Sequence, residues 1–407
     1  MILRSIAVFL AAVALVAGQD LLVRGGKVIP CKGAELAEAD VLVRNGRIEA
    51  VGPGLSADGS ATVIDARGRV IMPGFVLAHT SEGMDRSNEM VPVTPFISVL
   101  DGVDPSRPFF EDCLRDGHLT IALMPGERTI IGGTGVILRP RGLVVEDLLQ
   151  VDNAGMKLSL IPSAGNRAAH LAKLRAALDD AKQHLERKQA ESTAAASGNG
   201  RFDLEAFQLD RRKRELARML RGEIPAWIAC GTAADVDQAL RLADEYKLKI
   251  RLVLGGGTWR AFSLLTGKNL PVILDSEFEF REQDPESGEE VVRNLPQMLK
   301  KAGVKFAVTT APSSLGRRYL WYQAASLVRS GLTREEALAA VTCDAADAIG
   351  MGARKGSLEP GKDADILVLT DDPLSGRAWV ETGIIGGKVA YERSKDPRLT
   401  EIFGVGR

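Results

Sequence analysis

Short runs that alternate between hydrophobic and polar residues occupy both ends of the chain. The runs cover residues 21–24, 40–44, 47–51, 356–369 and 384–391. Asn45-Gly46 separates two of them and favours a type I′ hairpin turn, because both central residues of that turn take positive φ. Since the ends are rich in predicted strands and the middle is not, we predict one small composite β domain built from residues 19–70 and 351–395.

Between residues 71 and 350 the pattern changes to continuous apolar runs, typical of strands buried on both faces, that alternate with helical patterns. The predicted strands cover residues 70–78, 119–124, 157–161, 226–230, 250–254, 271–274 and 304–309. Helical patterns follow at 236–246 and 334–341. The repetition predicts an α/β fold, a (β/α)8 TIM barrel inserted into the composite β domain. A doubly wound sheet is the alternative, and no Gly-x-Gly-x-x-Gly motif follows a strand to support it.

Residues 166–222 interrupt the barrel pattern and predict a helical insertion. One helix face carries leucines at helical spacing, and a low-complexity stretch follows at 190–200. The leucines are Leu171, Leu174, Leu178 and Leu185. The insertion is either a solvated helical hairpin, or a lid over the barrel mouth or a contact surface for another subunit.

The first residues have the pattern of a secretory signal. Arg4 precedes an apolar run over residues 6–17, and the small residues Ala17 and Gly18 come before polar ones. The run is shorter than the about 20 residues that a membrane-spanning helix needs. We therefore expect residues 1–18 to be a signal peptide, the mature chain to have no transmembrane span, and the protein to be exported to the periplasm or outside the cell.

Composition narrows the choice of partners. The 407 residues, 45% hydrophobic, can bury a large core, and a formal charge of −1 gives no field that would collect nucleic acid or anionic lipid.

The four cysteines lie about a hundred residues apart, unlike a disulfide scaffold or a Cys-x-x-Cys site. They are Cys31, Cys113, Cys230 and Cys343. We expect buried single thiols, with one disulfide left open.

Three segments carry recognisable motifs: VIDARGRVIMPGF at 63–75, IIGGTG at 130–135 and GSLEPGKDAD at 356–365. Together they resemble the amidohydrolase superfamily, in particular its imidazolonepropionase-like group. The resemblance implies a metal-dependent hydrolase of non-peptide carbon–nitrogen bonds. It also implies a His-x-His pair on the first barrel strand, histidines on the fifth and sixth, and an aspartate on the eighth. These groups hold zinc or a related ion, which activates water at the carboxyl ends of the strands.

Measured against that pattern, only the first ligand position keeps its histidine. His79 matches it, and Ser81 stands at the second position. Ala229-Cys230-Gly231 stands near the fifth strand, Gly256 on the sixth, and Thr310-Ala311 on the eighth. Cys230 could be a soft ligand, but strand alternation favours its burial away from the mouth. One imidazole does not make a zinc site, which takes three protein ligands even when it is catalytic.

Carboxylates could rebuild a site. Glu82 and Asp85 follow the first strand, and Asp275, Glu277 and Glu279 alternate after the seventh, so these last three could share one face. Glu82, Asp275 and Glu277 are the candidates for catalytic roles. Oxygen ligands suit calcium, magnesium or manganese better than zinc. The alternative is solvated loop charges; we expect no cofactor, and a divalent metal, zinc or manganese, only if the site is rebuilt.

The other three histidines and the glycine-rich stretch give no evidence of a second metal site or a phosphate-binding loop. His118 opens the second strand at its amino end, and we expect His170 and His184 to be surface residues of the insertion. The glycine-rich stretch 125–135 lacks the Gly-Lys-Ser/Thr ending of a phosphate loop, so we expect a tight connection there.

Two hypotheses follow. The first is a hydrolase of carbon–nitrogen bonds with a degenerate metal site and weak or no zinc-dependent activity. The second is a non-catalytic pseudoenzyme that binds a small molecule, forms a homo-oligomer or pairs with an active paralogue.

Overall fold

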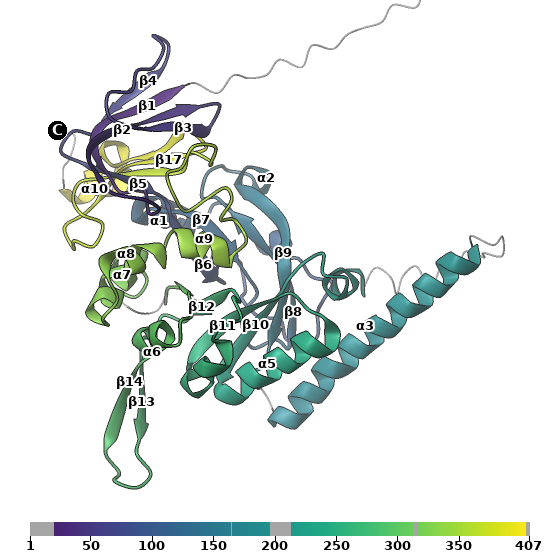
Figure 1. Cartoon of the computed structure of the whole chain (residues 1–407). Helices are drawn as coiled ribbons and strands as arrows, with labels where there is room; N and C mark the ends of the chain where they lie inside the picture. Colours follow the sequence, from purple (N-terminus) through teal and green to yellow (C-terminus); the bar gives the residue numbers. More distant parts are fainter. Residues whose placement is uncertain (1–19, 164, 196–212, 312–313, 315, 404–407) are drawn as a thin grey trace, which may run out of the picture.

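Two sheets organise the molecule, one built from both chain ends and one that forms a nearly closed barrel (Figure 1). The structure is a computed structural model that describes residues 20–163, 165–195, 213–311, 314 and 316–403. The predicted signal peptide and residues 196–212 of the predicted insertion lie outside these ranges. Among the residues described, no helix is long and apolar enough to cross a membrane.

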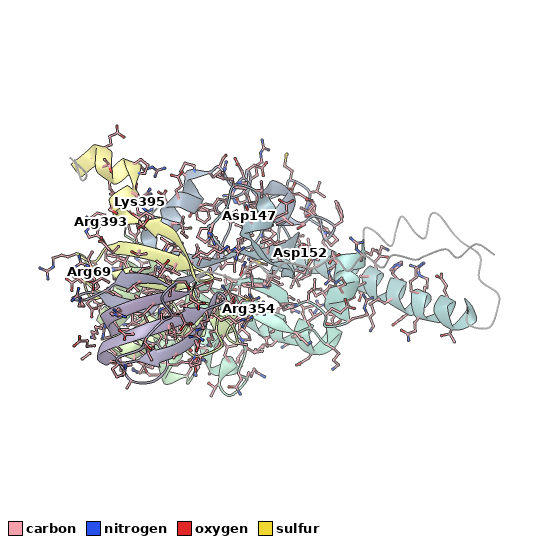
Figure 2. All side chains as sticks on the ribbon, turned by 90° about the horizontal axis from the view of Figure 1, so that it is seen from above. Arg69, Asp147, Asp152, Arg354, Arg393 and Lys395 are labelled. Carbon is pink, nitrogen blue, oxygen red and sulfur yellow. The ribbon has the colours of Figure 1, made fainter. Side chains whose placement is uncertain are left out.

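The terminal sheet joins strands that are some 300 residues apart in sequence. Its strands are β1 (Leu21–Val28), β2 (Leu36–Arg44), β3 (Arg47–Gly52), β4 (Thr62–Asp65), β5 (Val70–Pro73), β16 (Ile366–Leu369), β17 (Val380–Ile385) and β18 (Lys388–Glu392). Strand β5 pairs with β1 in parallel and with β16 in antiparallel orientation. Figure 2 shows the purple and yellow strands of the two ends side by side. The prediction of one β domain formed by both ends is confirmed.

The barrel sheet contains eight strands in the order β15-β12-β11-β10-β9-β8-β7-β6. They are β6 (Phe75–Thr80), β7 (His118–Leu123), β8 (Ile131–Leu138), β9 (Leu149–Ser159), β10 (Ala226–Thr232), β11 (Ile250–Gly257), β12 (Val272–Leu274) and β15 (Ala307–Val308). The first and last strands are bridged at Val341, whose carbonyl accepts from Val76 N at 2.9 Å, and at Ala340, whose carbonyl accepts from Val308 N at 3.2 Å. The predicted α/β barrel is confirmed as a nearly closed one.

Two strands differ from the prediction. The expected strand 70–78 is two strands, because the chain passes from the terminal sheet (β5) to the barrel (β6) at Gly74, where a side chain would lie 2.6 Å from Leu119. The expected connection at 125–135 contains the start of β8, which runs antiparallel to β7 and β9. A Cβ at Gly135 would lie 2.0 Å from Met124 Sδ, so glycine permits this close packing.

Helices and one hairpin surround the barrel. The helices are α1 (Pro108–Asp116), α2 (Val145–Leu148), α3 (Arg167–Ala195), α5 (Ala233–Tyr246), α6 (Leu295–Lys301), α7 (Leu320–Arg329), α8 (Arg334–Ala339), α9 (Cys343–Ala348) and α10 (Pro397–Phe403). Short 3-10 turns are η1 (Val99–Gly102), η2 (Trp259–Leu265) and η3 (Arg393–Lys395). In Figure 1, α3 and the hairpin of β13 (Glu279–Gln283) and β14 (Glu290–Asn294) project from the body.

Strand alternation separates two apolar layers in the barrel. Val76, Ala122, Trp227, Ile273 and Ala307 belong to the inner cluster. Their neighbours along the strands face outward and pack in the larger cluster beneath the helices. Inward-facing positions at the carboxyl ends of these strands are therefore the places where chemistry would occur.

Candidate functional site at the barrel mouth

His79 lies near the carboxyl end of β6 and faces the barrel interior. Leu77 pairs with Ile121 and Thr80 with Leu123, so Ala78 and His79 together lie opposite a single residue of β7. This β-bulge lets both residues turn inward. The His79 ring lies 6.3 Å from the indole of Trp227, and its side chain is buried.

Lys157 on β9 is the functional residue that sequence reasoning missed. Its side chain is fully buried, and its Nζ lies 3.2 Å from His79 Nε2 and 3.6 Å from a carboxylate oxygen of Glu127. The signal was present, because Met156 and Leu158 face the outer layer and strand alternation turns Lys157 inward. A lysine in a buried strand thus meets the one retained histidine.

Burial controls the protonation of this pair. Desolvation lowers the pKa of His79 well below its ordinary value, and the neighbouring charge of Lys157 lowers it further. Desolvation also lowers the pKa of Lys157, while Glu127 opposes that change. A neutral imidazole whose Nε2 accepts a hydrogen bond from Lys157 Nζ fits this geometry.

The fifth and sixth strands offer no metal donor at the expected positions. Cys230 is fully buried in the outer layer, as predicted, and burial raises the pKa of its thiol. A Cβ at Gly231 would meet Ile161 at 3.3 Å, and one at Gly256 would meet the Phe280 ring at 3.0 Å. Apolar side chains thus stand next to the positions where the family pattern has histidines.

The eighth strand ends in neutral hydroxyl groups. The Thr309 hydroxyl donates a hydrogen bond to the backbone carbonyl of His79, which helps to join β15 to β6. Gln323 Nε2 in turn donates to the Thr309 carbonyl at 3.0 Å. Thr310 is buried and carries no negative charge. These groups can hold the barrel closed, but they cannot replace an aspartate as a proton acceptor.

Asp275, Glu277 and Glu279 are exposed, and they alternate with the buried Ser276 and Phe278 as residues on one shared face would. Strand β12 itself ends at Leu274, so these residues lie beyond its regular pairing. Glu277 is exposed and pairs with Arg317 at 3.1 Å, and Glu279 belongs to the projecting hairpin. Asp275 stays near the site, where desolvation raises its pKa and Glu127 adds to the rise.

Glu82 and Asp85 are also separate from the buried pair. Burial raises the pKa of Glu82, and Arg318 counteracts that rise. Asp85 is exposed. Within the part of the chain that the structure describes, no group of three or more His, Cys, Asp or Glu side chains is placed to hold a metal ion.

The other histidines do not serve the mouth. His118 lies at the amino end of β7, where burial, assisted by Arg318, lowers its pKa to about 3. The expectation that His170 and His184 are surface residues is wrong, because both are buried. His170 Nε2 contacts the Ser159 carbonyl at 2.8 Å and so ties α3 to β9.

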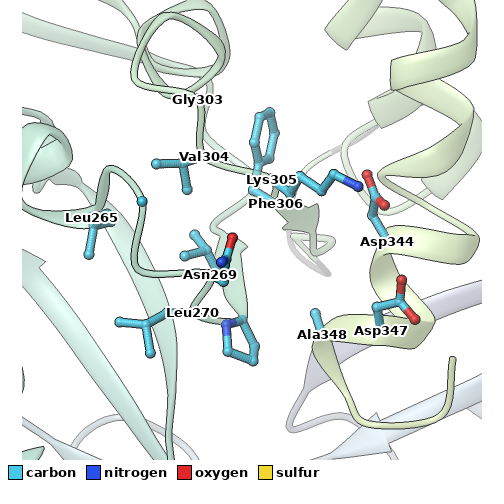
Figure 3. A pocket seen from close by; sticks show the side chains of 13 residues that line it. Leu265, Asn269, Leu270, Gly303, Val304, Lys305, Phe306, Asp344, Asp347 and Ala348 are labelled. Carbon is cyan, nitrogen blue, oxygen red and sulfur yellow. The ribbon is translucent and has the colours of Figure 1, made fainter.

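All four cysteines, which fall within the described ranges, are free thiols. A cavity of about 330 Å³ lies at the amino ends of β12 and β15, which is the opposite end of the barrel from His79. Figure 3 shows Lys305 and Asp344 pointing toward one another at its edge.

Sequence comparison relates the chain to amidohydrolases. The profile described as "Amidohydrolase family" matches residues 280–390. The amidohydrolase tasK of Hapsidospora irregularis is 25% identical over 371 residues, which cover 80% of this chain and 37% of that protein. The imidazolonepropionase of Pseudomonas savastanoi pv. phaseolicola is 45% identical over 80 residues, 18% of this chain and 20% of the relative. The chain thus spans well under half the length of these curated relatives.

Structural comparison gives a fuller match. The crystal structure of an amidohydrolase from Thermotoga maritima superposes with a TM-score of 0.82 and 26% identity, and the match covers 92% of this chain and all of that one. A putative prolidase from Bifidobacterium longum superposes with a TM-score of 0.54 at 19% identity, which shows likeness of fold alone.

Proposed function

Because the chain is a member of the amidohydrolase superfamily, we propose that it is a carbon–nitrogen hydrolase by descent whose zinc-dependent activity is weak or absent. We also propose that it belongs to the imidazolonepropionase-like group, which the 45% identity over 80 residues supports. We further propose that residues 1–18 direct its export.

The observation that carries the proposal is the contact between Lys157 Nζ and His79 Nε2 at 3.2 Å. Zinc binds an imidazole nitrogen at about 2.0–2.1 Å through the same lone pair that accepts this hydrogen bond. The ion and the lysine contact therefore exclude one another. Even if a neutral Lys157 turned to the metal, the pair would supply two protein donors, fewer than a catalytic zinc site takes.

The residues near the other ligand positions support the same conclusion. Phe280 crowds the space above Gly256, and Ile161 lies beside Gly231. On this proposal, His79, Lys157 and the residues at the other ligand positions do not fit a zinc ion, and no catalytic step involves a metal.

A panel of cyclic amides, dipeptides and N-acylated amines tests the proposal, with zinc or manganese added. We expect turnover below about 0.1 s⁻¹, some hundredfold under the value of about 10 s⁻¹ common among enzymes. The His79→Ala and Lys157→Met variants serve as comparisons. Zinc-stimulated turnover at ordinary enzyme rates, lost in His79→Ala, would contradict the proposal.

A second candidate function is non-catalytic: ligand binding at the mouth, homo-oligomer formation or pairing with an active paralogue. It is favoured because Thr309, which precedes the eighth-strand ligand position, helps to complete the barrel by donating a hydrogen bond to the His79 carbonyl. Co-expression with a catalytically complete family member, followed by size-exclusion chromatography, tests pairing. Separate elution of the two chains argues against it.

A further inference from the structure

Another cavity lies where the amino-terminal end of the barrel meets the terminal sheet. Its volume is about 310 Å³. Phe75, the first residue of β6, lines it together with Asp116 at the end of α1 and Val380 at the start of β17. Since His79 is near the other end of β6, this cavity is separate from the barrel mouth.

Aromatic rings form much of the wall. Tyr319 and Trp321 stack with ring centroids 5.8 Å apart and an interplanar angle of 23°. Trp379 comes from the segment before β17 and is 40% exposed. Guanidinium groups already stack on two of these rings, Arg318 on Tyr319 at 5.5 Å and Arg393 on Trp379 at 4.8 Å. The π faces therefore attract positive charge.

Asp116 supplies a negative charge that is not neutralised. Arg115 also lines the cavity, but Asp112 binds its guanidinium group at 2.6 Å and Asp396 at 2.8 Å. Arg318 lies 3.7 Å from Asp112. Among the described residues, none forms a hydrogen bond or ion pair with the Asp116 carboxyl group, on which Asp112, Arg318 and Arg115 act only as nearby charges. Every nearby cation is thus engaged by another carboxylate.

The electrostatic state of Asp116 is consistent with a missing cation. Burial, and secondly the charge of Asp112, raise its pKa to about 7, although Arg318 and Arg115 act in the opposite direction. A carboxylate in such a place gains from a positively charged partner that shares its desolvated environment.

We propose that this cavity binds a small organic cation, an alkylated ammonium compound, between Asp116 and the rings of Tyr319, Trp321 and Trp379. The carboxylate neutralises the charge, and the rings contact the alkyl groups bound to nitrogen through cation–π attraction. A cavity of about 310 Å³ is at the small end of ligand pockets, so the cation is choline-sized and not larger.

Isothermal titration calorimetry of the full chain with choline tests the site. We expect a dissociation constant of about 1 mM or tighter. The uncharged analogue of choline, in which carbon replaces nitrogen, should bind at least about tenfold more weakly, because it keeps the shape and loses the charge. Equal binding of the two compounds, or no heat from choline at concentrations well above that value, overturns the proposal.

Variants locate the site. Asp116→Asn keeps the size of the side chain and should weaken choline binding at least about tenfold, as should Trp379→Leu. The matched control is Asp344→Asn, which removes a carboxylate at the other cavity and should leave the affinity unchanged. Full affinity in Asp116→Asn, or an equal loss in both aspartate variants, contradicts the assignment.

A pH series on the unmodified protein keeps the test independent of variant folding. Because the pKa of Asp116 is about 7, choline should bind more weakly at about pH 6 than at about pH 8, as the carboxylate takes up a proton. The charged groups that face Asp116 are Asp112, Arg115 and Arg318. An affinity that does not change over this range contradicts the role of Asp116.

Discussion

At the scale of single residues, the chemistry of the barrel mouth depends on a few small or neutral side chains. His79 keeps its place through a β-bulge, whereas Gly256 on β11 and Thr310 after β15 bring no donor suited to zinc. Phe280 stands over Gly256, so packing as well as ligand chemistry bears on whether a metal-binding side chain could stand at this position.

Restoring the sixth-strand histidine should therefore be unfavourable. In Gly256→His the new Cβ would lie 3.0 Å from the Phe280 ring, and the imidazole would need space that this ring holds. We expect a loss of about 1–3 kcal/mol in the free energy of unfolding, measured by urea denaturation. Gly59→His, at an exposed glycine with open space around it, is the control and should change stability by less than about 0.5 kcal/mol. A Gly256→His variant as stable as this control would show that Phe280 does not block the position.

His118 should make stability depend on pH. Its pKa in the folded protein is about 3, below its ordinary value of 6.5. Between these two values the unfolded chain binds a proton at His118 and the folded chain does not. The stabilisation from neutral His118 is complete above about pH 6.5 and is lost as pH falls toward 3, at up to about 1.4 kcal/mol per pH unit.

Carboxyl groups with raised pKa, such as Asp116, act in the opposite direction, so the difference between two proteins is the useful quantity. The free energy of unfolding of His118→Gln should fall less steeply than that of the wild type between about pH 6.5 and pH 4. Equal slopes would show that His118 titrates normally in the folded state.

The residues of the candidate site differ in how far the sequence predicts them. His79 was predictable because it ends a buried strand in a recognisable motif. Lys157 belongs to no recognisable motif, although its place between the outward-facing Met156 and Leu158 marks it as an inward residue. The proximity of Glu127 to Lys157 depends on how the connection between β7 and β8 folds back, which no local pattern encodes.

At the scale of elements, alternation of apolar residues predicted most barrel strands but not the direction of every one. The sequence predicts a connection at the start of β8 because three glycines interrupt the apolar pattern of this strand. Those glycines allow contacts with Met124 and Ile97 that no side chain would permit, so a tertiary constraint determined what the local pattern obscured. The buried His170 and His184 have a similar cause, since the amino-terminal part of α3 packs on the barrel and only its far end projects.

The packing of α3 gives a prediction at this scale. Leu178 is fully buried, and its neighbour Asp179 accepts a hydrogen bond from the Tyr246 hydroxyl of α5 at 2.7 Å. Leu178→Ala should lower the free energy of unfolding by about 2–5 kcal/mol. The exposed Lys182→Ala on the same helix should have an effect below about 0.5 kcal/mol. If the two variants lose stability equally, the helix does not depend on this contact face.

At the scale of the whole molecule, the two chain ends hold the frame together. The GSLEPGKDAD motif at 356–365 takes part in a buried polar cluster. In this cluster Lys355 Nζ lies 3.2 Å from Asp363 and also binds Asp365. Asp365 in turn accepts from the Gly386 backbone at 2.9 Å. The motif that made the superfamily recognisable is therefore structural, which explains why the fold could be predicted from sequence more fully than the chemistry.

The central claim is that this barrel keeps the amidohydrolase frame without a transition-metal site. Elemental analysis of protein purified from zinc- and manganese-supplemented medium tests it most directly. We predict less than about a tenth of an equivalent of either metal per chain, because one imidazole bound to a lysine cannot hold the ion. About one equivalent of zinc that survives dialysis, and that His79→Ala removes, would contradict the account.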